Sequence, residues 1–356
     1  MRGGLDGQHN TLAPSTALTI IAFGVIVAGL VYGRQFLLPL ALAIFLWNLM
    51  EAMVQGFSSA EIAHFRAPRW LATLLGIATV GLGFYLIFTI LLGQVDAINA
   101  AMPRYLSRFQ AMVADLTEWL GPDRAAKVRD ALASIDVTKR LPGLIASTQS
   151  IIITALLIIA YIAFLFVEQG QVGTKIAAMF SDKRKAEEAN ELLEEISTSV
   201  RRYIWFKTIV SVLTGVACYV VLRFFDIDFA ETWALLIFVL NYIPNIGSIV
   251  AVAFPCLLAL VQFETLTPFL FLVTSLTLIQ IAIGSVLEPM LMGKGLNMSP
   301  FAIILSLAFW GMIWGIAGMF LSVPILVIIM IVCAHVPKWR WVAVSLSKDG
   351  NIATEK

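Results

Sequence analysis

Five polar side chains lie inside apolar stretches of the sequence or directly after one, and they are the residues best placed to do chemistry. They are Asn241, Asn245, Ser248, Gln280 and Glu288. Polar and ionisable groups among apolar residues are costly to bury and often functional, because they can bind a polar solute or exchange a proton or cation. Glu288 is the candidate for proton or cation coupling, and an interfacial pair with Lys294 is the alternative.

Backbone breaks occur in two apolar stretches, 232–261 and 300–335, that are too long for one simple helix. The residues that mark the breaks are Pro244, Gly247, Gly311, Gly315 and Gly318. Hydrocarbon cannot satisfy the backbone groups that proline and glycine free, so such breaks persist only where they face protein or a watery cavity. In secondary transporters, broken helices present these groups to the cargo. We therefore expect both breaks to line a substrate path, and kinked helices packed against their neighbours are the alternative.

Signatures of common enzymes are missing from the sequence. It contains no HExxH, no GxSxG and no phosphate-binding GxxxxGK[ST]. The three histidines are scattered, and the three cysteines lie in apolar runs without the paired spacing of a metal site. We therefore expect no catalytic residues, no ATP hydrolysis, no cofactor and no metal site.

The composition is that of an integral membrane protein. Hydrophobic residues make up 60% of the 356 residues and charged residues only 13%, against roughly a quarter charged in an ordinary soluble domain. The net charge of +1 provides no basic field, so membrane lipid is the expected surrounding and no nucleic-acid partner is expected.

Apolar runs of about 20 residues, the length that spans a bilayer as a helix, recur along the chain. Six of them are 16–32, 36–54, 70–92, 149–167, 203–225 and 268–286. Together with the two broken stretches, they predict an all-α polytopic membrane protein of about eight membrane segments, two of which are broken or re-entrant helical hairpins.

Two polar regions also show helical patterns. Within 93–148, apolar residues recur every three or four positions from Leu106 to Leu120, and a second stripe follows. This predicts a small helical insert outside the bilayer, with a ligand-gathering lid as an alternative role. Residues 181–202 are acidic early and basic late, which matches the helix dipole. Since they lead directly into the run 203–225, we expect one long helix that enters the bilayer without a break.

Basic residues set the expected orientation, because cytoplasmic loops are enriched in Lys and Arg. They gather before Trp70, between 168 and 202, and in the C-terminal tail, so both termini are expected in the cytoplasm. The expected segments are a cytoplasmic N-terminus 1–15, membrane helices 1–3 over 16–92, an extracytoplasmic insert 93–148, membrane helix 4 over 149–167, a cytoplasmic amphipathic helix 168–202, a transport core with broken helices 203–335 and a cytoplasmic tail 336–356.

At several of these segments the chain resembles the autoinducer-2 exporter family of bacterial membrane proteins. The resemblance is carried by the Glu-rich helix that leads into Arg202-Tyr203-Ile204-Trp205-Phe206-Lys207, by Asn241-Tyr242-Ile243-Pro244-Asn245-Ile246-Gly247, by Gln280 to Gly295 with Glu288-Pro289, by Pro300, and by Gly315-Ile316-Ala317-Gly318-Met319-Phe320-Leu321-Ser322-Val323-Pro324. It extends from Ala17 to Pro337. Where the family commonly has an aromatic or aliphatic residue, this chain has Asn245, which makes its first break more polar.

The resemblance implies a multi-pass protein of the bacterial inner membrane that assembles as a homo-oligomer, with a pentamer among the forms considered. It implies a secondary transporter that exports a small polar molecule, such as the autoinducer-2 quorum-sensing signal. Two alternatives stay open: a sodium or lithium/proton antiporter, and a non-transporting or channel-like membrane oligomer.

Overall fold

The computed structural model describes residues 12–59, 68–120, 148–292 and 297–352. In these ranges the chain is helical almost throughout, and its β-structure is limited to a bridge between Met298 and Ser347. Within the same ranges six helices are long and apolar enough to cross a membrane, and three shorter apolar helices accompany them. The prediction of an all-α polytopic membrane protein is confirmed.

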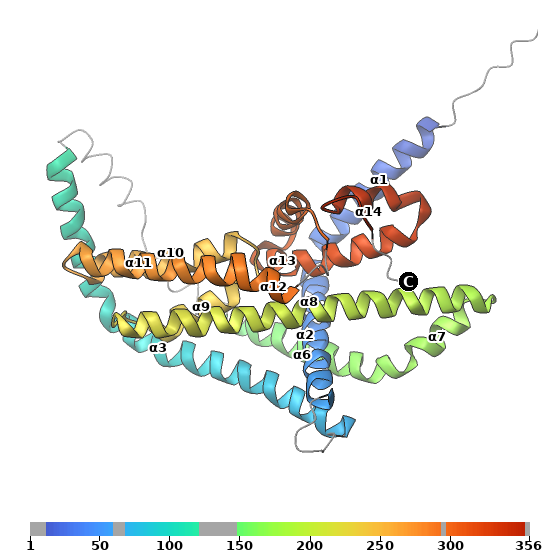
Figure 1. Ribbon diagram of the computed structural model, residues 1–356, viewed down its shortest axis with the longest axis horizontal. Coiled ribbons are helices and arrows are strands. Elements are labelled where there is room, and N and C mark those ends of the chain that lie inside the picture. The colour runs from blue at the N-terminus through green and yellow to red at the C-terminus, as the bar shows by residue number, and fades with distance from the viewer. Residues whose placement is uncertain (1–11, 60–67, 121–147, 293–296, 353–356) are drawn as a thin grey trace, which may run out of the picture.

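Four helices of the N-terminal half cover the first four predicted apolar runs. They are α1 (Leu12–Tyr32), α2 (Arg34–Ser59), α3 (Arg69–Leu120) and α6 (Thr148–Glu168). α2 packs against α3 and α6 (Figure 1). Large apolar side chains such as Ile20, Phe88 and Ile159 remain exposed on these helices, as expected for surfaces that face lipid.

α3 is longer than the membrane span within it. It runs unbroken for 52 residues, whereas the apolar span ends at Gln94. The helix predicted over 106–120 is therefore a direct continuation of the third span. Gly93 does not interrupt it, since one glycine costs a helix only about 1 kcal/mol. The second predicted stripe, 128–135, lies outside the described residues.

The long helix predicted from the acidic segment is α8 (Lys183–Phe224), which runs for 42 residues without a break. It follows a short turn after η1 (Gln169–Gln171) and α7 (Val172–Met179). The Asp182 carboxylate caps α8 by accepting a hydrogen bond from the Arg184 backbone N–H at 3.0 Å. α8 lies alongside both broken segments and packs against α2, α9, α11 and α13 (Figure 1), where α9 is Ala230–Leu240, α11 is Leu266–Ile281 and α13 is Pro300–His335.

The first broken stretch is a re-entrant hairpin made of α9 and α10 (Ile246–Gln262). Its two ends meet: the Gln262 side chain donates to the Asp226 carbonyl at 2.7 Å and accepts from the Asp228 backbone N–H at 3.0 Å. The chain therefore returns to the level at which it entered, as the sequence predicted.

The second broken stretch, α13, is also a hairpin. The Ser306 hydroxyl donates to the Ser322 carbonyl at 2.9 Å, although 16 residues of straight helix would separate the two by about 24 Å. The reversal occurs at Gly315, whose φ of 65° lies in the left-handed region. Beyond the hairpin, η3 (Pro337–Trp339) and α14 (Arg340–Leu346) bring the tail back to the start of α13, where Ser299 N–H donates to the Leu346 carbonyl at 2.8 Å.

The two hairpins open at opposite ends of α8. The ends of the first lie beside the C-terminus of α8, where Arg223, Asp226 and Asp228 line a common pocket. The second ends at His335, whose ring lies 3.3 Å from Glu195 in the N-terminal half of α8. Between them, α11, the π-helical segment η2 (Ala282–Leu287) and α12 (Glu288–Met292) form one further continuous membrane helix.

Candidate functional site

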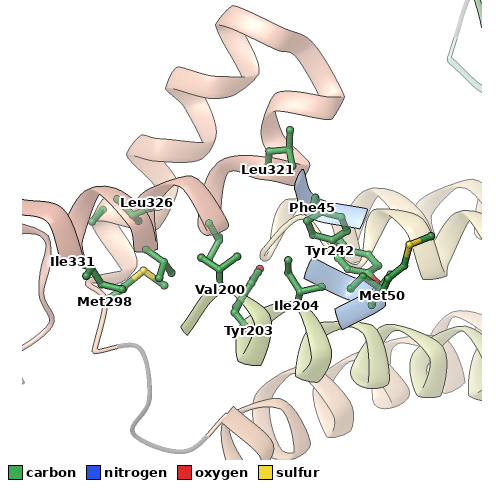
Figure 2. Packing of buried hydrophobic residues seen from close by; sticks show 14 of the residues in the cluster. Phe45, Met50, Val200, Tyr203, Ile204, Tyr242, Met298, Leu321, Leu326 and Ile331 are labelled. Atoms are coloured by element: carbon green, nitrogen blue, oxygen red, sulfur yellow. The ribbon is translucent and has the colours of Figure 1, made fainter. Parts of the chain in front are cut away.

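The tips of the two hairpins pack against one another and against α2. Tyr242, in the turn of the first hairpin, is 4% exposed, and its ring centroid lies 4.7 Å from that of Phe320 in the second hairpin. Phe45 of α2 lies 4.7 Å from Phe320 and 5.9 Å from Tyr242. Figure 2 shows Phe45, Tyr242 and Leu321 gathered at this point, next to Ile204 of α8. Helices that enter from opposite ends therefore meet at one aromatic contact.

Glycines allow each hairpin to close tightly. A Cβ at Gly247 would lie 1.8 Å from the Leu240 carbonyl oxygen, and one at Gly318 would lie 2.0 Å from that of Trp310. Only a residue without a Cβ fits at either place. Gly311 has a related role, since its Cβ would meet the Met319 side chain at 2.8 Å. These predicted break residues are thus the points where the two arms of each hairpin touch.

Polar residues of the first tip form a hydrogen-bonded set. The Asn241 side chain is buried, and its Nδ2 donates to the Ser211 hydroxyl of α8 at 3.1 Å. The Ser248 hydroxyl donates to Asn241 Oδ1 at 3.2 Å. Pro244 and Asn245 make the turn itself, and Asn245 is exposed with a positive φ of 59°. The structure therefore brings Asn241 and Ser248 together, while Asn245 serves the backbone turn.

A row of buried polar residues on α8 contacts this tip. Its members are Tyr203, Lys207, Thr208, Ser211 and Thr214, none of which is more than 9% exposed. The Thr208 and Tyr242 hydroxyls lie 2.7 Å apart. This row was not predicted from the sequence, although polar residues spaced by three or four positions within the apolar run 203–225 indicate one face of a helix.

Glu288 pairs with a buried lysine of that row. Lys207 Nζ lies 2.6 Å from Glu288 Oε1, and the two side chains are 3% and 22% exposed. The alternative partner considered from the sequence, Lys294, lies outside the described residues. Lys207 and Ser211 are one turn apart, so the ion pair and the Asn241 contact lie about 6 Å apart along α8.

Gln280 lies on the same continuous helix as Glu288. Its amide nitrogen is enclosed and bonds to none of the described residues. In an ideal α-helix, positions eight apart differ by about 80° around the axis. A π-bulge inserts one residue, so the eight act as seven and the difference falls to about 20°. The π segment η2 therefore brings Gln280 and Glu288 onto nearly the same face.

A polar pocket lies at the base of the first hairpin. It has a volume of about 590 Å³ and is lined by residues of α3, the end of α8, the turn that follows and the start of α9, among them Gln94, Arg104, Arg223, Asp226 and Glu231. Arg104 pairs with Asp228 at 2.6 Å, and the Tyr105 hydroxyl also donates to this carboxylate. Burial and that hydrogen bond raise the pKa of Tyr105. The pocket could not be predicted from the sequence, because it joins segments more than 100 residues apart.

Groups of three or more potential metal ligands are absent from the described part of the chain. The cysteines Cys218, Cys256 and Cys333 are free thiols. Besides this pocket, the described residues offer hydrogen bonding at the hairpin tip and the Lys207–Glu288 ion pair.

Comparison with known proteins agrees with the resemblance found in the sequence. The family described as AI-2E family transporter matches residues 18–338. The AI-2 transport protein TqsA of Escherichia coli K12 is 28% identical over 330 residues, which cover 91% of this chain and 92% of that protein. A putative transport protein of Haemophilus influenzae is 25% identical over 89% of this chain and 92% of its own length, and one of Borreliella burgdorferi is 41% identical over 40% of each. The chain therefore belongs to the AI-2E transporter family and is a multi-pass membrane transport protein.

Proposed function

We propose that the protein is a secondary exporter of a small polar molecule, and that autoinducer-2 is the first cargo to test. The observation that carries the proposal is the meeting of two oppositely directed re-entrant hairpins beside the partly buried Asn241–Ser248–Ser211 set. Re-entrant helix ends buried at membrane depth are typical of cargo sites in secondary transporters. The name of the Escherichia coli relative, an AI-2 transport protein, supports the choice of cargo.

The polar set suits a cargo with hydroxyl or carbonyl groups. Asn241 supplies both a donor and an acceptor, and the two serines supply hydroxyls that rotate to fit either role. Tyr242, the neighbour of Asn241 in the chain, packs against Phe320 within an apolar cluster. A small, uncharged, oxygen-rich solute therefore matches the hairpin tip better than a large or strongly charged one. Gly311, Gly315 and Gly318 line the path on the side of the second hairpin in this proposal.

The setting of the exporter is part of the same proposal. Both termini lie in the cytoplasm of a bacterial cell, the chain lies in the inner membrane, the insert 93–148 lies outside, and the protein catalyses no reaction. It assembles as a homo-oligomer, and the pentamer is the form to test by native mass spectrometry of the detergent-solubilised protein. The basic residues before Trp70, between 168 and 202 and in the C-terminal tail support the orientation, because cytoplasmic loops are enriched in Lys and Arg.

Uptake of radiolabelled autoinducer-2 into inverted membrane vesicles tests the exporter. Vesicles with the protein should accumulate the label faster than empty vesicles. Asn241→Leu should abolish the difference, because leucine keeps the branched shape of the side chain and removes its hydrogen bonds. Asn48→Leu is the matched control: Asn48 is also buried, at 5% against 4% exposed, but it bonds to the Ile44 carbonyl of its own helix. Equal uptake by empty vesicles and vesicles with the protein would refute the cargo.

Cation/proton antiport is the second candidate, and the Lys207–Glu288 pair is the observation that favours it. An intramembrane carboxylate whose charge is balanced by a movable cation can exchange that cation for a proton. In proteoliposomes that hold a pH gradient, adding sodium or lithium should collapse the gradient. A gradient that persists at all tested concentrations of either ion would exclude this candidate.

A further inference from the structure

The Lys207–Glu288 pair has the features of an ion site that is occupied by a side chain. Lys207 is 2% exposed, so its ammonium has no access to bulk water. Among the described residues its partner is Glu288 Oε1, at 2.6 Å. Burying a charge in this way is expensive, and burial of ionisable groups at membrane depth usually serves a function.

Besides its own carboxylate, the helix around Glu288 offers a backbone carbonyl oxygen as a second potential cation ligand. The Glu288 N–H donates to the Ile283 carbonyl, five residues earlier, which is the π-helical register. Pro289 follows and has no N–H, so the next carbonyl in that register, of Gly284, lacks the donor that another residue would supply. A carbonyl that lacks its helical donor, one turn from a carboxylate, offers an oxygen of the kind with which transporters bind coupling cations.

Two further buried side-chain atoms, one on α8 and one on α11, bond to none of the described residues. The Tyr203 side chain is 5% exposed, and its hydroxyl bonds to none of the described residues. Tyr203 stands one turn before Lys207, on the same face of α8. The Gln280 amide nitrogen is enclosed and also unpartnered, and the π segment turns Gln280 toward the face of Glu288. The Tyr203 hydroxyl is therefore a buried polar group, one turn from the ion pair, that is free to contact a bound ion.

We infer that Lys207 is a tethered competitor for a monovalent cation, Na⁺ or Li⁺, at the Glu288 carboxylate. The ammonium neutralises Glu288 while no cation is bound, and the cation displaces it. The two positive charges exclude each other because one carboxylate neutralises only one of them. Lys207 and Ser211 are one turn apart on α8, and the Ser211 hydroxyl accepts a hydrogen bond from Asn241. Displacement of the ammonium therefore changes the contacts of α8 one turn from the first hairpin tip.

This inference deepens the proposed function, because it assigns the coupling ion of the transporter, but its test does not use cargo. Binding of ²²Na⁺ to the purified full-length protein is measured by equilibrium dialysis in choline chloride. Lys207→Met removes the competing charge and keeps the length of the side chain. Suppose that the Lys207 ammonium is away from the Glu288 carboxylate in about one molecule in ten or fewer. Removing the competing ammonium then lowers the apparent Kd for Na⁺ by about tenfold or more.

Matched variants separate charge from packing. Lys207→Arg keeps the positive charge and should not tighten Na⁺ binding. Glu288→Gln should abolish binding, both alone and combined with Lys207→Met. An unchanged Kd in Lys207→Met, or Na⁺ binding that survives in the double variant, would overturn the inference.

A measurement on the unaltered protein covers the case in which Lys207→Met fails to fold. Saturating NaCl should increase the acetylation of Lys207 by acetic anhydride, measured by mass spectrometry against equal choline chloride, because the cation frees the ammonium. No increase would overturn the inference. If vesicles fail to export autoinducer-2 while Na⁺ still raises Lys207 acetylation and Lys207→Met still tightens binding, the exporter proposal falls and the cation site stands.

Discussion

Gly247→Ala is the sharpest single perturbation of the first hairpin. The added Cβ would lie 1.8 Å from the Leu240 carbonyl oxygen, whereas ordinary contact begins at 3.4 Å. The arms must therefore separate by about 3.4 − 1.8 = 1.6 Å, and a backbone carbonyl cannot rotate away as a side chain does. Overpacking of a close-packed site costs roughly 1–3 kcal/mol, and more where the backbone has to move.

The same displacement breaks the polar set at the tip. The Ser248 to Asn241 hydrogen bond is already 3.2 Å long, and a hydrogen bond lengthened by more than half an ångström is lost. Insertion into the membrane should not suffer, since the six long apolar helices do not include this hairpin. We therefore expect Gly247→Ala to reach the membrane in normal amount and to lose transport.

Uptake of labelled autoinducer-2 into inverted vesicles, normalised to the amount of protein, measures this effect. A loss of 1.4 kcal/mol or more in the transport-competent state corresponds to at least about a tenfold lower rate. Gly83→Ala is the matched control, because no atom lies within 4 Å of its added Cβ and alanine favours a helix over glycine. Wild-type uptake by Gly247→Ala would refute the claim that the closed hairpin tip is needed for transport.

Three further predictions concern the ion pair and the topology. Glu288→Gln should assemble but lose the dependence of transport on a pH gradient, and an unchanged pH profile would remove Glu288 from coupling. Breaking the pair with Lys207→Met or Glu288→Gln alone should lower the free energy of unfolding by about 3–5 kcal/mol. Combining them should recover most of that loss, since both charges are then gone, and simple addition of the two losses in SDS unfolding would contradict the pair. Single cysteines at Ser107 or Ser134, in a protein without native cysteines, should react with a membrane-impermeant thiol reagent in intact spheroplasts, and labelling only after lysis would reverse the topology.

The helical spans and both hairpins followed from the sequence because each rests on a local signal. Apolar runs of bilayer length predict spanning helices, and Pro244, Gly247 and Gly315 mark places where a helix cannot simply continue. The continuity of α3 through Gly93 did not follow, because a single glycine weakens a helix without ending it.

The contacts of the site did not follow, because they join residues distant in sequence. Glu288 has a lysine six positions away in the chain, Lys294, and one 81 positions away, Lys207, and only the fold shows that the second lies 2.6 Å from it. The π segment that turns Gln280 toward Glu288 has no sequence signature of its own. The row on α8 was visible as a spacing of polar residues, but the sequence does not say what it faces.

Cross-linking the two hairpin tips tests most directly the proposal that cargo passes between them, which requires the tips to separate. Cysteines replace Tyr242 and Phe320, whose rings are 4.7 Å apart, in a protein without native cysteines, and a short bifunctional methanethiosulfonate joins them. If cargo passes between the tips, the cross-link should form within one chain and stop uptake of labelled autoinducer-2 into inverted vesicles. Reduction should restore the uptake. Full uptake by the cross-linked protein would contradict the account, because cargo would then pass without any separation of the tips.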